Sequence, residues 1–276
     1  MKKTELIDQI RSKNSYLCVG LDSTYEKIPE HIKKTERPVF EFNRQIIDAT
    51  APYAIAYKPN LAFYECRGLE GWKDLELTAQ YIKSTYPEIF LIADAKRGDI
   101  GNTSAMYAKA FFETMNFDAV TVAPYMGRDS VSPFLGYKDK YIIILALTSN
   151  AGSADFQYIK SANGKNLYVE VLEKSSLWGS DENTMYVVGA THASDFEEVR
   201  KIIPSHFLLV PGVGAQGGSL EDVAGKGMNS ECGLIVNASR SVIFAGNGHD
   251  FAEKSAKECE NMQQIMEISL RNKKII

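Results

Sequence analysis

Eight short, nearly continuous apolar runs recur along this chain of 276 residues, and they constrain its fold more than any other feature. The runs do not alternate between apolar and polar residues, which is typical of parallel strands that are covered on both faces. Stretches with helical spacing of apolar residues lie between them. The runs occupy residues 16–21, 54–57, 89–93, 119–122, 141–146, 185–188, 207–210 and 234–236.

The intervening segments predict helices at residues 38–51, 102–114 and 250–271. The sequence Ser194-Asp-Phe-Glu197 predicts a capping box that opens a further helix ending at Ile203. Eight strand–helix units in about 250 residues predict an α/β fold of the (β/α)8 TIM-barrel type. A doubly wound open sheet is the alternative that strand count alone leaves open. Because no linker divides the chain, we expect residues 1–276 to form a single domain.

Composition excludes several classes of protein. The formal net charge of −4 and the absence of a basic tract argue against a nucleic-acid partner. The four cysteines and four histidines are dispersed, so no disulfide framework and no metal site is expected. Neither a signal peptide nor an apolar stretch long enough to span a membrane is present, and we expect a cytoplasmic protein.

Charged residues follow the predicted strands where a TIM barrel places its active site. Asp94 and Lys96 come after the third run, and alternation along a strand points both into the barrel mouth. Lys58 follows the second run and precedes Pro59, which favours an extended backbone at Lys58. A surface ion pair is the alternative interpretation. Since charges after so apolar a run need partners, and paired charges in a cleft are typical of functional sites, we favour a site.

A glycine-rich segment after the seventh run is the second signal. The sequence Val213-Gly-Ala-Gln-Gly-Gly218 can expose backbone N–H groups to an anion near a helix start. Arg240 follows the eighth run, and barrels often build a phosphate site from these two loops. Glycines also serve ordinary turns, but together with Arg240 they favour a phosphate-bearing ligand.

The stretch Asp94-Ala-Lys96-Arg-Gly-Asp99-Ile-Gly-Asn-Thr103 closely resembles the signature of the orotidine 5′-phosphate decarboxylases. Most of the chain resembles the longer bacterial subfamily, type 2, of that family. The further matching stretches are Gly20-Leu-Asp22, Lys58-Pro-Asn60, Pro124-Tyr-Met-Gly-Arg-Asp129, Thr148-Ser-Asn-Ala-Gly-Ser153 and Pro211-Gly-Val-Gly-Ala-Gln216. The Asp-x-Lys-x-x-Asp core alone is shared with related sugar-phosphate enzymes, whereas the combination is much more specific.

The resemblance implies conversion of orotidine 5′-phosphate to uridine 5′-phosphate (UMP) and CO2, the last step of UMP synthesis, by a homodimer without metal or organic cofactor. It also implies a set of site residues. Lys58, Asp94, Lys96 and Asp99 would form a catalytic tetrad, with Asp99 and Thr103 contributed across the dimer interface. The implied substrate-binding residues are Asp22, Ser149, Gly214, Gln216, Ser239 and Arg240.

Two alternatives remain open. A magnesium-dependent sister enzyme would have a metal-ligating Glu where this chain has Lys58, which repels Mg²⁺. A phosphate-ligand sensor on the same barrel would not need two Lys and two Asp set against each other.

Thr148 could replace Ser149 as the contact to the pyrimidine. The role of the insertion at residues 155–177 is not indicated by the sequence.

Overall fold

The computed structural model describes residues 1–213 and 218–276, and its centre is a closed barrel of eight parallel strands in sequential order. Pairing of the first strand with the eighth closes the sheet, which confirms the TIM barrel and excludes the open doubly wound sheet. The strands are β1 (Leu17–Gly20), β2 (Ala54–Lys58), β3 (Phe90–Arg97), β4 (Ala119–Val122), β5 (Tyr141–Leu147), β6 (Thr184–Val188), β7 (Leu208–Pro211) and β8 (Leu234–Ala238).

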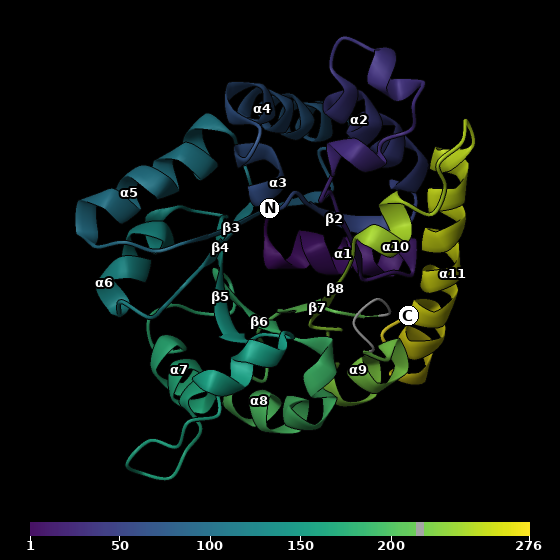
Figure 1. The fold of residues 1–276 in the computed structure, drawn as a ribbon. Coiled ribbons are helices and arrows are strands. Elements are labelled where there is room, and N and C mark those ends of the chain that lie inside the picture. The colour runs from purple at the N-terminus through teal and green to yellow at the C-terminus, as the bar shows by residue number, and fades with distance from the viewer. Residues whose placement is uncertain (214–217) are drawn as a thin grey trace.

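Helices surround the barrel and cover its outer face (Figure 1). The longer ones are α1 (Lys3–Lys13), α2 (Pro38–Thr50), α4 (Gly68–Thr85), α5 (Gly101–Lys109), α7 (Leu167–Ser175), α8 (Phe196–Ile202), α9 (Leu220–Gly227) and α11 (Phe251–Asn272). The shorter ones are α3 (Ala62–Glu65), α6 (Arg128–Val131) and α10 (Arg240–Ile243), and single turns include η5 (Ala151–Asp155) and η6 (Ala190–Asp195). No helix in the described part of the chain is both long and apolar enough to cross a membrane.

The helices predicted at residues 38–51 and 250–271 match α2 and α11 within one residue at each end, and the other two predicted helices differ from the structure. The helix predicted at residues 102–114 is α-helical to Lys109 and continues as one π-helical turn over Ala110–Thr114. The capping box predicted from Ser194 is wrong. The N-cap of α8 is Asp195, which makes no side-chain cap bond. Its carboxylate instead accepts from the hydroxyls of Tyr158 and Tyr168, because these two donors reach it from the preceding βα unit.

Helix α1 covers the amino-terminal end of the barrel. The Lys3 ammonium forms ion pairs at 2.7 Å with Asp181 and Glu231, which precede β6 and β8. Lys13 donates to the carbonyls of Ala51 and Ala54 at the start of β2. The barrel is therefore closed at this end, and its opposite end remains available for a ligand.

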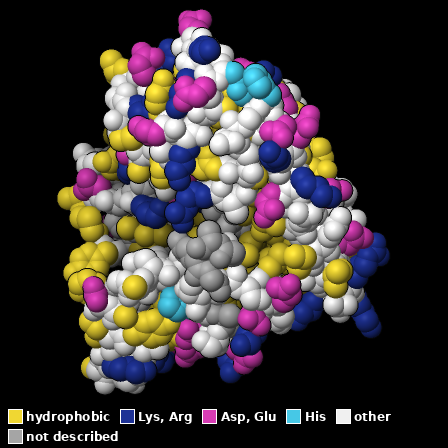
Figure 2. Space-filling model, turned by 45° about the vertical axis from the view of Figure 1, so that its right-hand side comes forward, with side chains coloured by type: hydrophobic (Ala, Val, Ile, Leu, Met, Phe, Trp, Pro, Cys, Tyr) yellow, Lys and Arg dark blue, Asp and Glu magenta, His cyan; other side chains and the backbone are white. Residues whose placement is uncertain are grey.

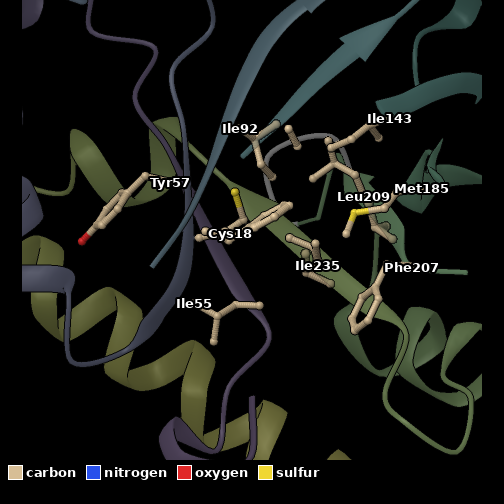
Figure 3. Packing of buried hydrophobic residues seen from close by; sticks show 14 of the residues in the cluster. Cys18, Ile55, Tyr57, Ile92, Ile143, Met185, Phe207, Leu209 and Ile235 are labelled. Carbon is tan, nitrogen blue, oxygen red and sulfur yellow. The ribbon is translucent and has the colours of Figure 1, made fainter. Parts of the chain in front are cut away.

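The barrel interior is filled in layers by alternate residues of each strand. Figure 3 shows Ile92, Ile143, Leu209 and Ile235 pointing toward one another inside the barrel, and all four are buried. Tyr57 points away from them, and its hydroxyl donates to the Ile47 carbonyl of α2. Because side chains repeat their direction every second residue, the next inward layer toward the strand ends begins two residues further on.

Candidate active site

The inward-facing side chains two residues beyond this apolar layer form the floor of a cavity of about 440 Å³ at the carboxyl ends of the strands. They are those of Asp94, Leu145, Pro211 and Asn237. The barrel interior changes from apolar to polar within one layer, since Asp94 lies two residues after Ile92 and Asn237 two residues after Ile235 on the same faces of their strands. The wall residues that the structure describes are Asp22, Lys58, Asn60, Asp94, Lys96, Thr121, Leu145, Thr148, Ser149, Asn150, Val187, Leu209, Pro211, Gly212, Val213, Asn237, Ser239, Arg240 and Ser241.

A carboxylate held between two ammonium groups is the main charged feature of this cavity. Asp94 Oδ2 accepts from Lys58 Nζ at 2.8 Å, and Asp94 Oδ1 accepts from Lys96 Nζ at 2.6 Å. The Lys58 and Asp94 side chains are only 5% and 10% exposed, whereas that of Lys96 is half exposed. Lys96 is thus the ammonium group that a ligand in the cavity can approach from solvent.

Burial and charge act on these groups in opposite directions. Burial alone would raise the pKa of Asp94, but the charges of Lys58 and Lys96 outweigh it and hold that pKa well below its usual range. Burial alone would lower the pKa of Lys58, but the carboxylates of Asp94 and Asp22 raise it instead. Asp94 and Lys58 are therefore both ionised over the whole physiological pH range.

Thr121 on β4 supports this array, and sequence reasoning missed it. Its hydroxyl donates to Asp94 Oδ1 at 3.1 Å and accepts from the backbone N–H of Lys96 at 2.9 Å. Lys96 has a left-handed backbone with φ of +48°, and the pairing register between β3 and β4 shifts at this point. A threonine inside an apolar strand is ordinary β-propensity, so the sequence carries no signal for this contact.

Asp22 and Ser239 line the cavity after β1 and β8, two strands that pair in the barrel. The Ser239 hydroxyl donates to the Gly20 carbonyl at 3.1 Å, and a Cβ on Gly20 would lie only 2.7 Å from that of Ser239. Asp22 Oδ1 is buried and has no hydrogen-bond partner among the described residues. Because a buried carboxylate oxygen without a partner is unfavourable, this atom is suited to accept from a ligand hydroxyl. Arg240, the next residue after Ser239, also lines the cavity.

Thr148 and Ser149 both line the cavity, but their hydroxyls differ in what they bind. The Thr148 hydroxyl donates to Asn150 Oδ1 at 2.6 Å and accepts from Gln157 Nε2 at 2.9 Å. No hydrogen bond within the described residues engages the Ser149 hydroxyl, so Ser149 is the better suited of the two to contact a ligand.

Four of the residues predicted for the site are not among the described wall residues, for two reasons. Gly214 and Gln216 lie outside the described residues. Asp99 and Thr103 are described but do not line the cavity. The Asp99 carboxylate accepts from the N–H of Ile100, and α5 begins two residues later.

No group of three or more His, Cys, Asp or Glu side chains within the described ranges converges in a way that could bind a metal ion. In the cavity itself, two ammonium groups flank Asp94, an arrangement that opposes binding of a cation.

Fold and site together define a TIM-barrel protein with a compact array of opposite charges at the carboxyl ends of its strands and an arginine beside it. Comparison with known proteins then assigns the family. Residues 15–255 match the model of the orotidine 5′-phosphate decarboxylase / HUMPS family. The chain belongs to this family.

Relatives match over nearly their full length. Orotidine 5′-phosphate decarboxylase of Phocaeicola vulgatus is 61% identical over 97% of this chain and 98% of its own. The protein of the same name from Porphyromonas gingivalis is 56% identical over all of both chains. Among solved structures, Leishmania donovani OMP decarboxylase is 36% identical with a TM-score of 0.80, covering 96% of this chain and all of its own.

Proposed function

We propose that this protein decarboxylates orotidine 5′-phosphate to UMP and CO2, the last step of de novo pyrimidine nucleotide synthesis. Family membership and the names of its relatives support this assignment. The observation that carries it is the Lys58–Asp94–Lys96 array, buried at one end and open to the cavity at the other. An ammonium group fixed beside a carboxylate suits a reaction in which negative charge develops on a carbon atom.

Lys96 would carry the chemical step. When the bond between C6 of the pyrimidine and its carboxylate breaks, CO2 leaves and the electron pair stays on C6. The ring stabilises this vinyl-type carbanion poorly, so the barrier is large. The Lys96 ammonium stabilises the charge as it develops and then transfers a proton to C6, which completes UMP. Lys96 regains its proton from water.

Asp94 and Lys58 would prepare Lys96 for that step. Asp94 fixes the position of the Lys96 ammonium group through an ion pair of 2.6 Å. Asp94 would also lie near the substrate carboxylate, and that like-charge contact ends when CO2 leaves. We rank the stabilisation by Lys96 above this effect. Lys58 and the partner's Asp99 complete the tetrad.

The remainder of the substrate would be held by groups around the cavity. The buried oxygen of Asp22 suits a ribose hydroxyl, and the Ser149 hydroxyl suits the pyrimidine. Arg240 and the backbone at Ser239 would bind the phosphate, together with Gly214 and Gln216. Binding energy at the phosphate can then be used to hold C6 against Lys96.

We also propose that the active unit is a homodimer in which Asp99 and Thr103 complete the partner's site. Both residues lie outside the wall of their own cavity. Beside them Ile100 and Met106 are 55% and 62% exposed, and Tyr125 after β4 is 93% exposed. Large apolar side chains so exposed are typical of an interface.

The two segments that carry these apolar side chains, one after β3 and one after β4, lie against each other. The Ser104 hydroxyl donates to the Ser130 carbonyl, and a Cβ on Gly98 would lie 2.7 Å from the Ala123 carbonyl oxygen. In Figure 1, α5 and α6 are neighbours on the same side of the barrel. One apolar surface could therefore form beside Asp99.

We propose a small-molecule substrate, no nucleic-acid partner and a cytoplasmic location. On the face shown in Figure 2, acidic and basic side chains are interspersed, which does not favour binding of nucleic acid there. Cys18, Cys66, Cys232 and Cys259 are free thiols, the usual state in a reducing compartment.

The test is the loss of orotidine 5′-phosphate absorbance on adding protein purified from a host that lacks this activity. The assay contains excess EDTA, and the product is identified by chromatography. Rapid formation of UMP supports both the reaction and its independence of metal. Lys96→Ala protein, purified in parallel, controls for contaminating enzyme. If orotidine 5′-phosphate is not converted but a sugar phosphate is turned over with Mg²⁺, the proposal is refuted in favour of the sister enzyme. If folded dimer shows no turnover in either assay, the proposal is also refuted.

A further inference from the structure

Thr148, at the end of β5, is held on three sides by residues that come later in the chain. Its N–H donates to Gln157 Oε1 at 2.8 Å, and its hydroxyl accepts from Gln157 Nε2 at 2.9 Å. Its carbonyl oxygen lies 2.9 Å from Nε2 of His192. Every polar group of this residue is thus occupied, although Thr148 lies at the cavity wall.

The residues that hold Thr148 belong to two different loops. Gln157 and Tyr158 lie in the insertion between η5 and α7, which extends away from the barrel at the lower left of Figure 1. His192 and Asp195 lie in η6, after β6. The Tyr158 hydroxyl connects the two loops, since it lies 2.8 Å from both His192 Nδ1 and Asp195 Oδ2.

The connection continues into the helices behind the loops. The Tyr168 hydroxyl of α7 donates to Asp195 Oδ1 at 3.1 Å and also contacts Glu198 of α8. The Tyr158 ring packs against the rings of Tyr168 and His192, with centroids 5.6 and 5.7 Å away. The loops are therefore anchored to two helices of the barrel as well as to each other.

The protons available on these groups limit which atoms can donate in the hydrogen bonds between Thr148, His192, Tyr158 and Asp195. The Thr148 carbonyl can only accept, so His192 Nε2 carries a proton. Burial and the neighbouring Asp195 raise the pKa of Tyr158, so its phenol is neutral and can donate only once. The single Tyr158 proton is therefore shared between two partners, Asp195 Oδ2 and His192 Nδ1. The His192 ring also lies close to this carboxylate, with Nδ1 3.9 Å from Asp195 Oδ2.

The loop after β6 also contacts Ser149, the residue that follows Thr148. A Cβ on Gly189 would lie 2.7 Å from the backbone N of Ser149, and Gly189 N–H donates to the Leu147 carbonyl. Thr191 donates to the Ser149 carbonyl at 3.3 Å. Any displacement of η6 would therefore move Ser149.

We propose that Gln157, Tyr158, His192 and Asp195 form a brace that sets the position of residues 148–150 for the pyrimidine base. This inference rests on the proposed function and gives the insertion a role within it. The four brace residues act through Thr148 and Ser149 as positioning residues. The hydrogen bonds of the brace reach Thr148 after β5, whereas Ser239 and Arg240 follow β8. Of the η6 residues, Ala190 packs against Gly218 after β7, but the brace residues His192 and Asp195 form their hydrogen bonds with Thr148, Tyr158 and Tyr168. Loss of the brace should thus weaken recognition of the base much more than recognition of the phosphate.

The experiment compares two ligands by calorimetry: UMP, which carries the base, and ribose 5-phosphate, which does not. In Tyr158→Phe the ring packing is kept and the hydroxyl link is lost. We expect the Kd for UMP to rise about five- to tenfold, as for one lost hydrogen bond, and the Kd for ribose 5-phosphate to stay within about twofold. His192→Leu should behave likewise. His192→Gln, whose amide can still donate to the Thr148 carbonyl, should recover most of the affinity for UMP.

The matched control is Tyr137→Phe, which removes a tyrosine hydroxyl bonded to the Glu113 carboxylate away from the cavity. It should leave both affinities unchanged. Equal weakening of both ligands in Tyr158→Phe would show a general structural role and overturn the brace. Unchanged UMP affinity in both Tyr158→Phe and His192→Leu would overturn it as well. Absence of decarboxylation by the wild-type protein would instead refute the proposed function, so the two failures are distinguishable.

Discussion

Replacing Asp94 by Asn would measure how strongly the charged array depends on its central carboxylate. The Asn side chain has nearly the same shape but no charge, so Lys58, which is 4% exposed, would face Lys96 without its main counter-ion. Removing one partner of a buried ion pair typically destabilises a protein by about 3–5 kcal/mol. Two features reduce the value here. Asp22 remains near Lys58, and the cavity admits water beside Lys96.

We therefore expect Asp94→Asn to lower the free energy of unfolding by about 2–3 kcal/mol, or the melting temperature by roughly 4–10 °C. Urea denaturation at neutral pH, with an unchanged m-value, measures it. Lys58→Met combined with Asp94→Asn removes both buried charges and should recover at least half of the loss. Asp8→Asn, which changes a 74%-exposed carboxylate on α1, is the control and should shift stability by less than about 0.5 kcal/mol.

The pH dependence of this difference has a definite sign. Folding lowers the pKa of Asp94, so the Asp94 carboxylate contributes fully to stability above its unfolded pKa of about 4, and this contribution is lost as the pH falls below that value. The difference in free energy of unfolding between wild type and Asp94→Asn should be constant from about pH 5 to 9 and should become smaller below about pH 4. If Asp94→Asn is as stable as wild type at neutral pH, the argument is refuted, because the Asp94 charge would then contribute nothing to the stability of the folded protein.

Other predictions concern activity. Lys96→Ala should abolish turnover, a loss of at least about 10⁴-fold, yet still bind UMP in calorimetry; near-normal turnover would contradict the proposed mechanism. A mixture of inactive Lys96→Ala and inactive Asp99→Ala subunits should regain activity, up to about a quarter of the wild-type level when exchange is random, since some dimers then contain one intact site; no recovery after proven subunit exchange would exclude a shared site. Thr121→Val should reduce kcat by about 5- to 30-fold through misplacement of Lys96, with a smaller change in KM, whereas Thr121→Ser should stay close to wild type; equal losses in both variants would count against the hydroxyl contacts.

Most of the fold could be predicted because buried parallel strands leave a strong apolar signal. The observed strands lie within a few residues of the predicted runs, except that β3 continues to Arg97. Alternation placed Asp94 and Lys96 on one side of that strand. The two side chains do meet, but through the left-handed backbone at Lys96, which alternation does not predict.

The parts that the sequence did not indicate depend on contacts between distant segments. His192 is an isolated histidine in the sequence, and only folding brings it to the Thr148 carbonyl, 44 residues earlier. The Ser194 capping motif was wrong for the same reason, since Tyr158 and Tyr168 compete for Asp195 from another unit of the barrel. Local patterns describe what a segment can form alone, and these side chains are placed by their neighbours.

The left-handed backbone of Lys96 has a consequence for protein design. Glycine or asparagine would relax this conformation, and a procedure that selects residues for stability alone would choose one of them. Either choice would remove the only half-exposed ammonium group of the Lys58–Asp94–Lys96 array. A redesigned barrel could thus have a higher melting temperature and no catalytic activity, so Lys96 must be kept unchanged during any such optimisation.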